Sequence, residues 1–105
     1  MPTVPLAPVP LAAFGVTDPA MQDFVTPRIG GQPWRTFFEP VRVSPDIGSV
    51  PQTYILCTKW GIASPMTRFV PVMEARVARI VTIAGSHLSI LTEPEETLEA
   101  ILATP

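Results

Sequence analysis

Charge is scarce in this sequence. Charged residues make up 15% of its 105 residues, whereas a typical soluble domain has about 25%. The seven basic residues are scattered, the formal net charge is -2 and the pI is near 5.2, so we expect no nucleic-acid partner. Low charge together with a mean hydropathy of +0.34 indicates apolar surface that a partner would cover.

Cysteine and histidine each occur once, as Cys57 and His87. One cysteine excludes an internal disulfide and is typical of a reducing compartment, so we expect a cytoplasmic location. One histidine and one cysteine do not supply the three or four ligands of a metal site, and the sequence has no phosphate-binding loop. We therefore expect no metal and no cofactor. Cys57 lies in an apolar run and is expected to be a structural thiol.

Long uninterrupted apolar runs are also missing. Proline or charge interrupts each one well short of the ~20 residues that a membrane-spanning helix needs, so we expect no membrane partner. Residues 1–13 are apolar, but they lack a basic start and contain four prolines, which argues against a signal peptide. A Pro-rich, extended arm is the better interpretation.

The clearest structural pattern in the sequence is in residues 79–96, which read as a strand, a loop and the start of a helix. The β-branched run Ile80–Ile83 predicts a strand, and its continuity predicts burial on both faces. His87 follows in a loop, at the edge where open α/β sheets keep their sites. The other interpretation of His87 is a loop histidine without a role.

A helix is predicted after this loop. Thr92 and Glu95 have the spacing of a capping box, and Pro94 falls in the first turn. Leu98, Ile101 and Leu102 then follow at helical spacing.

The preceding residues predict a second strand and a second helix. Residues 50–58 read as a short strand, and Ser64-Pro65 is a cap-and-proline helix start, with Pro71 expected to kink or end that helix. The order strand, helix, strand, helix favours a parallel α/β sheet. Because two strands make too small a sheet, we expect them to be the end of a longer one.

The first half is predicted to be less regular. Asp18-Pro19 predicts a helix start, with Met21, Phe24 and Val25 at helical spacing on its apolar face. Residues 32–43 are expected to be extended, and residues 44–49 to form a turn. The aromatic residues of this segment either line an apolar pocket or pack under a loop: Trp34, Phe37 and Phe38.

Several short motifs together resemble the carboxyl-terminal part of an α/β-hydrolase, closest to hydroxynitrile lyases and plant-methylesterase-like hydrolases. They are Tyr54-Ile55-Leu56-Cys57-Thr58, Pro65, Gly85-Ser86-His87 and Thr92-Glu93-Pro94-Glu95. Phe14-Gly15-Val16-Thr17-Asp18-Pro19 and Gln32-Pro33-Trp34 are similar to the end of the cap in that subgroup. The resemblance covers roughly residues 12–104. It implies an arm (1–13), the end of a cap (14–49) and a carboxyl-terminal α/β-hydrolase core portion (50–105).

The resemblance implies that His87 is the catalytic histidine of a serine triad, and that Leu88 borders the substrate pocket; Trp34 is a second candidate for that pocket. The sequence departs from the family at the other two triad positions. Trp60 stands where the family has its aspartate, with Asp46 or Glu39 as alternative acids. No Gly-x-Ser-x-Gly elbow occurs, and the family order places the serine before Met1.

Two functions remain open. The first is the carboxyl-terminal segment of an esterase-like hydrolase acting on small esters or amides, which is catalytically incomplete alone. The second is a degenerate, non-catalytic remnant that binds a protein partner or forms oligomers. In either case we expect self-association through an exposed sheet edge.

Overall fold

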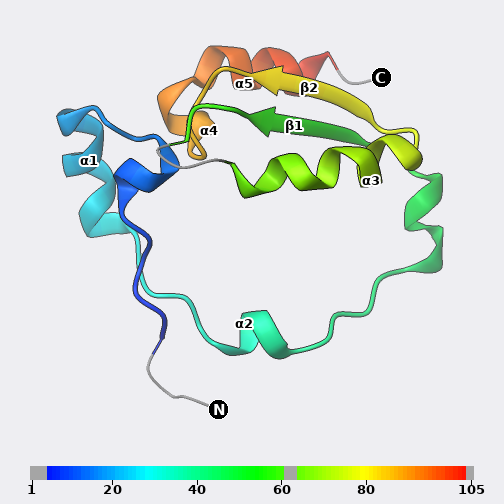
Figure 1. Ribbon diagram of the computed structural model, residues 1–105, viewed down its shortest axis with the longest axis horizontal. Coiled ribbons are helices and arrows are strands. Elements are labelled where there is room, and N and C mark those ends of the chain that lie inside the picture. Colours follow the sequence, from blue (N-terminus) through cyan, green and yellow to red (C-terminus); the bar gives the residue numbers. More distant parts are fainter. Residues whose placement is uncertain (1–4, 61–63, 104–105) are drawn as a thin grey trace.

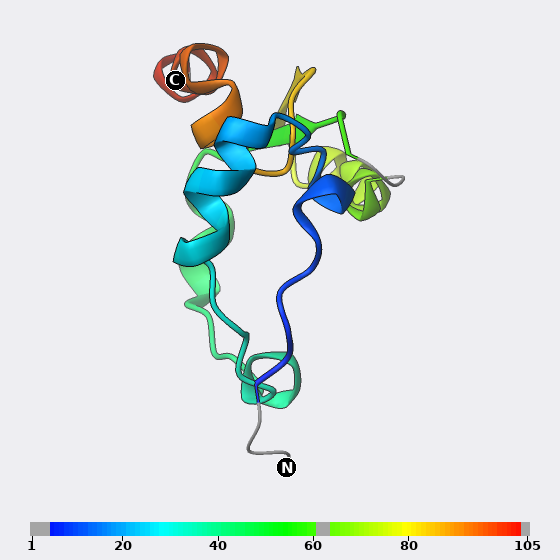
Figure 2. The same ribbon diagram turned by 90° about the vertical axis from the view of Figure 1, so that its left-hand side faces the viewer.

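The computed structural model describes residues 5–60 and 64–103 and shows a mixed α/β arrangement (Figure 1). Strands β1 (Thr53–Cys57) and β2 (Arg79–Ile83) pair in parallel, in a register that runs from Thr53 opposite Arg79 to Cys57 opposite Ile83. The helices α3 (Val70–Ala75) and α5 (Pro94–Leu102) lie on opposite faces of this pair (Figures 1 and 2). The predicted parallel sheet with its strand, helix, strand, helix order is confirmed.

The helical connection between the strands begins as predicted. The Ser64 hydroxyl accepts a hydrogen bond from the Met66 amide and caps a 3-10 helix, Pro65–Phe69, which continues directly into α3. The prediction that Pro71 ends the helix is wrong, since the connection continues to Ala75, although it changes from a 3-10 helix to an α-helix just before Pro71. Pro71 lies in the first turn of α3, where its missing N–H removes no helical hydrogen bond.

The predicted capping box at Thr92 is also wrong. Thr92 ends a short helix, α4 (Ser89–Thr92), and the residue that precedes α5 is Glu93, which makes no side-chain cap. The Thr92 hydroxyl is occupied by Ser86 and by the Leu88 carbonyl, so it is not free to cap α5. Pro94 does stand at the start of the helix, as its fixed φ favours.

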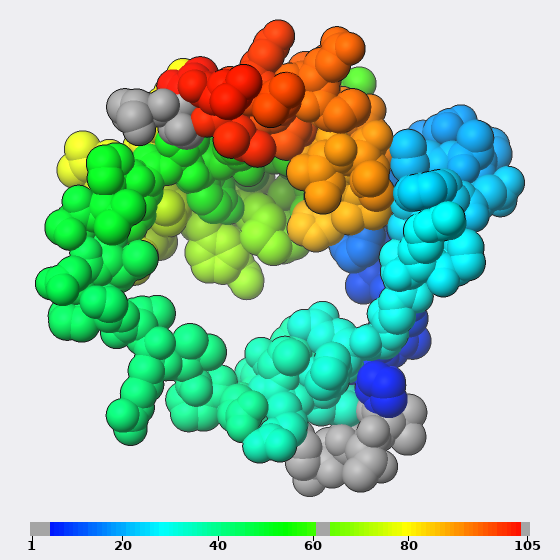
Figure 3. Space-filling view, turned by 180° about the vertical axis from the view of Figure 1, so that it is seen from behind, coloured from blue at the N-terminus to red at the C-terminus, as the bar shows by residue number. Residues whose placement is uncertain are grey.

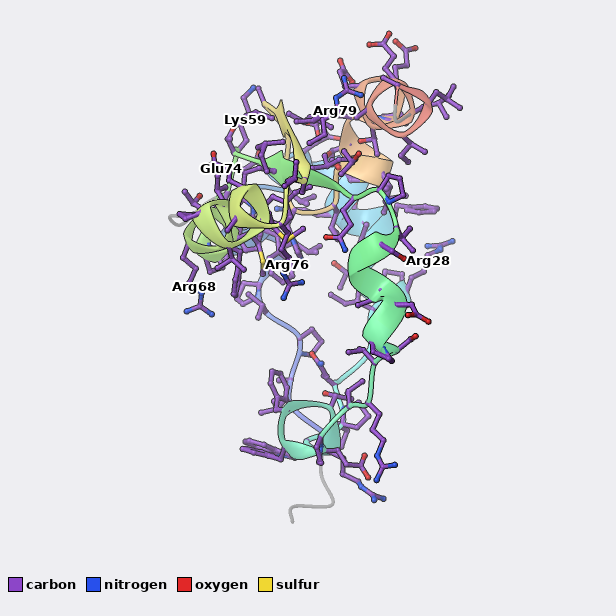
Figure 4. All side chains as sticks on the ribbon, turned by 90° about the vertical axis from the view of Figure 1, so that its right-hand side faces the viewer. Arg28, Lys59, Arg68, Glu74, Arg76 and Arg79 are labelled. Atoms are coloured by element: carbon purple, nitrogen blue, oxygen red, sulfur yellow. The ribbon has the colours of Figure 1, made fainter. Side chains whose placement is uncertain are left out.

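The sheet is less buried than its continuous apolar run predicts. Ile83 in β2 and Leu56 in β1 are buried, but Arg79 and Thr82 are exposed. The prediction of burial on both faces is therefore wrong for β2, because one helix on each face of two strands leaves much of the sheet uncovered. Arg79 extends beside α5, where its guanidinium donates to the Ala103 carbonyl (Figure 4).

The amino-terminal half contains its own small core. Helix α1 (Pro19–Val25) is capped by Asp18, whose carboxylate accepts from the Met21 amide at 3.1 Å, as predicted. The buried residues of this core are Leu11, Val16 and Val25, against which Phe14, Met21, Ile29 and Leu88 pack. Phe24 does not share this face and is exposed, with the Arg28 guanidinium 4.0 Å from its ring centroid.

Residues 33–52 form an arc that joins the two halves (Figure 1). The prediction of an extended segment is wrong for part of it, since Arg35–Phe38 forms the helical turn α2. A 2.7 Å ion pair between Arg35 and Glu39 and a hydrogen bond from the Thr36 hydroxyl to the Pro33 carbonyl stabilise this turn. The turn predicted at residues 44–49 is present as a 3-10 helix, Pro45–Ser49, capped by Ser44.

The chain encloses an opening instead of one packed core (Figure 3). Its radius of gyration is 15.9 Å, whereas about 13 Å is expected for a compact chain of this length. Its accessible surface of 7816 Å² is about a third larger than the ~5,800 Å² expected for its mass. The arc presents several exposed large apolar residues: Phe37, Phe38, Val41, Val43, Ile47 and Val50. No helix among the described residues is long and apolar enough to cross a membrane.

Candidate functional site

His87 lies in the loop between β2 and α4, at the carboxyl end of the parallel strands. The loop is held to two other segments by main-chain hydrogen bonds. The Lys59 amide donates to the Gly85 carbonyl at 2.8 Å, and the His87 amide donates to the Phe14 carbonyl at 2.8 Å. The continuation of β1, the loop after β2 and the start of the amino-terminal half therefore meet at His87.

The side chain of His87 packs in an aromatic cluster. Its ring centroid is 4.3 Å from that of Trp60 and 4.7 Å from that of Phe14, and the last two rings meet edge to face at 5.6 Å. His87 keeps an exposed edge, yet the surrounding groups desolvate the imidazole, and this lowers the pKa of His87 below its usual 6.5. The neutral imidazole, the form that accepts a proton, is thus favoured at pH 7.

Trp60 occupies the place beside His87 where the hydrolase resemblance expects an acid. Its indole N–H is buried and has no hydrogen-bond partner among the residues that the structure describes. Neither of the alternative acids, Glu39 and Asp46, lies beside His87. Glu39 pairs with Arg35 next to α2, and Asp46 belongs to the 3-10 helix Pro45–Ser49, on the far side of the opening (Figure 1). Within residues 5–60 and 64–103, no side chain hydrogen-bonds the imidazole.

Ser86 and Glu93 hold the His87 loop in shape. Ser86 is 1% exposed; its hydroxyl pairs with that of Thr92 at 2.7 Å and accepts from the Leu88 amide at 3.0 Å. The Glu93 carboxylate accepts from the Ser86 amide at 3.2 Å. A Cβ on Gly85 would come within 2.6 Å of the same carboxylate, so this position favours glycine. Sequence reasoning did not assign these roles, because the spacing of Thr92 and Glu95 pointed to a helix cap.

His87 and Leu88 line two different cavities. His87 lines a cavity of about 250 Å³ together with Tyr54, Ile55, Cys57, Trp60 and Met66. Leu88 lines another, of about 380 Å³, together with Phe14 and Phe37. Of the residues expected to form a pocket, the structure thus brings Leu88 and Phe37 together. Trp34 lines neither cavity, and its ring stacks on that of Phe38 with centroids 6.1 Å apart.

Cys57 borders the cavity of His87 and is half-buried. Its thiol lies 3.4 Å from the Ser89 hydroxyl and donates to it, which links β1 to α4. Among the described residues, no three side chains of the types that ligate metals are grouped closely enough to hold an ion.

Comparisons with models of known protein families, with curated proteins and with solved structures find no match to this chain. The class that the structure itself defines is a mixed α/β arrangement with one parallel strand pair and a histidine at its carboxyl end. The structural guide to function is therefore the geometry around His87.

The lowered pKa of His87 predicts how stability changes with pH. Because the unfolded chain has the higher histidine pKa, it binds more protons than the folded chain as pH falls below about 6.5. Above that pH, His87 therefore leaves the free energy of unfolding unchanged. As pH falls toward the pKa of the folded chain, protonation of His87 in the unfolded chain lowers the free energy of unfolding. Urea unfolding between pH 7.5 and 5 should show this loss, and His87→Gln should remove it. An unchanged slope in His87→Gln would assign the loss to carboxylates instead.

Proposed function

We propose that this chain is the carboxyl-terminal segment of an esterase-like α/β-hydrolase, in which His87 is the base of a serine triad. The position of His87 supports the proposal best: it follows β2 directly, at the carboxyl end of a parallel strand pair, in a loop bonded to the residues that follow β1. A catalytic histidine of this kind needs to face a serine supplied by another segment, since no Gly-x-Ser-x-Gly elbow occurs in these 105 residues.

The chemistry asked of His87 is proton transfer. A neutral imidazole takes the proton of the serine hydroxyl as the oxygen attacks the carbonyl carbon, and then returns it to the leaving alcohol or amine. The lowered pKa keeps His87 in this neutral form. The neighbouring cavity of about 250 Å³ has room for a small ester or amide beside the imidazole.

Within the described part of the chain, the proposed triad lacks a carboxylate beside His87 to act as its acid. Trp60 packs on the imidazole but cannot accept its N–H or stabilise the imidazolium that forms during the reaction. Turnover of the completed site is therefore expected to be low.

The open shape of the chain favours a second candidate function, a non-catalytic module that binds a protein partner or a second copy of itself. The sheet order β1-β2 leaves each strand with one edge that no described strand pairs, and such edges readily pair with another chain. The excess surface of ~2,000 Å² over a compact chain is more than the roughly 800 Å² that each partner contributes to a standard interface.

The intact mass of the native protein, with that of any chain that copurifies, separates the two functions. A longer polypeptide or a copurifying chain that carries Gly-x-Ser-x-Gly supports the hydrolase. A lone chain of 11.4 kDa, monomeric or self-associated, favours the non-catalytic module.

Residues 1–105 alone are expected not to hydrolyse p-nitrophenyl acetate faster than the same concentration of free imidazole. A solvent-facing histidine without a serine or an acid is no better than the free base. His87→Ala should lower the hydrolysis rate by no more than the rate that an equal concentration of free imidazole supplies. A rate well above free imidazole that disappears in His87→Ala would mean that the chain contains its own nucleophile.

A further inference from the structure

The larger of the two cavities, about 380 Å³ in volume, lies beneath the amino-terminal arm and has an almost wholly apolar wall. Among the described residues that line it, none has a charged side chain, and the one polar side chain is that of Gln32, whose amide donates to the Thr36 hydroxyl at 2.8 Å. Its larger apolar lining residues include Leu6, Val9, Leu11, Phe14, Phe37 and Leu88. A cavity of this kind offers contact area but no charge or free hydrogen-bonding side chain.

The arm is held over this cavity by main-chain hydrogen bonds. Leu6 and Gln32 form an antiparallel bridge, with bonds of 2.8 and 2.9 Å between their amide and carbonyl groups. Gly31 permits this approach, because a Cβ there would come within 2.8 Å of the Leu6 carbonyl oxygen. The cavity wall also includes Leu11 and Phe14, at the two ends of the 3-10 helix Leu11–Phe14, which pack in the amino-terminal core. The arm and the amino-terminal core therefore both line this cavity.

We propose that the cavity beneath the arm binds a small, uncharged, apolar molecule, such as an alkyl chain or an aromatic ring system. Its volume lies within the roughly 300–1,000 Å³ typical of small-molecule sites. An ionised ligand group would lose its hydration without gaining a partner from this wall, so neutral ligands are favoured. The arm already forms part of the wall, and a space of about 380 Å³ suits a small molecule better than a polypeptide. This inference does not depend on the proposed hydrolase function.

Phe14 connects this cavity to the histidine. Its ring lines the cavity and also contacts His87, with centroids 4.7 Å apart. A ligand that shifts the Phe14 ring changes the environment of the imidazole and of Trp60, whose ring is 5.6 Å from that of Phe14. Ligand binding should therefore be visible in the NMR signals of the His87 ring.

A fluorescence titration of the full chain with N-phenyl-1-naphthylamine, an uncharged apolar dye, tests the proposal. Binding should saturate at one dye per chain, and 1-octanol should displace the dye at concentrations at least tenfold lower than octanoate does. Binding without saturation would indicate nonspecific adsorption to exposed apolar surface and would overturn the proposal. Equal displacement by octanol and octanoate would also contradict it.

Two neighbouring aromatic residues of α2 supply a matched pair of variants. Phe37 and Phe38 are 58% and 62% exposed, but Phe37 lines the cavity, whereas Phe38 does not line it and stacks on Trp34. Phe37→Ala is expected to weaken dye binding about five- to tenfold, as the loss of one aromatic contact implies, and Phe38→Ala less than twofold. Equal effects of the two substitutions would place the dye elsewhere.

Filling the cavity gives a second, independent variant. Ala7 is an exposed residue of the arm that lines the cavity, and a tryptophan there should occupy the space and weaken dye binding at least tenfold. Unchanged binding in Ala7→Trp with an unchanged far-UV spectrum would contradict the proposal. If this variant loses its fold, the comparison of Phe37→Ala with Phe38→Ala decides.

Discussion

Replacing Gly15 by alanine is expected to abolish cooperative folding of the chain. Gly15 follows the 3-10 helix Leu11–Phe14 with φ of +82°, a left-handed conformation that alanine adopts at a cost of about 1 kcal/mol or more. In addition, the new Cβ would lie 1.7 Å from the Lys59 carbonyl oxygen and 2.8 Å from its carbon. Because both are main-chain atoms, the overlap can be relieved only by separating the two segments.

The total loss is expected to exceed about 3 kcal/mol, which places this substitution in the exceptional range for single residues. A chain with so small a buried core has little stability to lose, so urea unfolding followed by tryptophan fluorescence should show no cooperative transition.

Gly48→Ala is the control. A Cβ on Gly48 meets no atom within 4 Å, and the residue has no positive φ. The free energy of unfolding of the Gly48→Ala variant should therefore stay within about 0.5 kcal/mol of that of the native chain. Similar unfolding midpoints for Gly15→Ala and Gly48→Ala would show that the main chain at Gly15 does not pack against Lys59 in solution.

The second large effect concerns the acid of the proposed triad. If the amino-terminal part of a plant-methylesterase-like hydrolase, with its Gly-x-Ser-x-Gly elbow, is joined ahead of residue 14, Trp60→Asp should raise ester turnover by about four orders of magnitude. The carboxylate would accept the imidazole N–H that the Trp60 ring cannot accept, and would stabilise the imidazolium. The measurement is kcat for p-nitrophenyl acetate in the parent fusion, which keeps Trp60, and in its Trp60→Asp variant.

Two further variants test whether the increase in turnover comes from a carboxylate at position 60 that acts through His87. Trp60→Asn leaves the same space beside His87 as Trp60→Asp does but introduces no charge, so its turnover should stay near that of the parent fusion. His87→Ala combined with Trp60→Asp should return turnover to the background. Equal rates for the parent fusion, Trp60→Asp and Trp60→Asn that all depend on His87 would mean that another group serves as the acid, or that none is needed.

The features that the sequence predicted correctly depend on local physics. The β-branched run in β2 and the Ser64 and Asp18 caps are specified by residues within a few positions of each other. The parallel pairing follows because a helix separates the strands. The hydroxyl of Thr92 was misassigned because Ser86, six residues earlier, competes for it.

The candidate site around His87 could be predicted only in part from the sequence. His87 was predicted to be a site residue from its place after a strand, but its contacts with Phe14 and Trp60 depend on how three distant segments pack. No spacing rule connects residues so far apart. The helical turn α2 was missed for a different reason: two prolines and three aromatic residues predict extended backbone, whereas the Arg35 and Glu39 pair favours a turn.

The arc of residues 33–52 has a consequence for the lifetime of the chain in a cell. Between Glu39 and Ser44 it is exposed backbone without regular structure, the kind of segment that proteases cut first. A single cut there would divide the chain into two pieces, held together by the packing of Leu88 against the amino-terminal core and by the contacts of Phe14 and Gly15 with Lys59, Trp60 and His87. Protection from degradation thus depends on whether something covers the arc, and the abundance of the chain should follow that of whatever covers it.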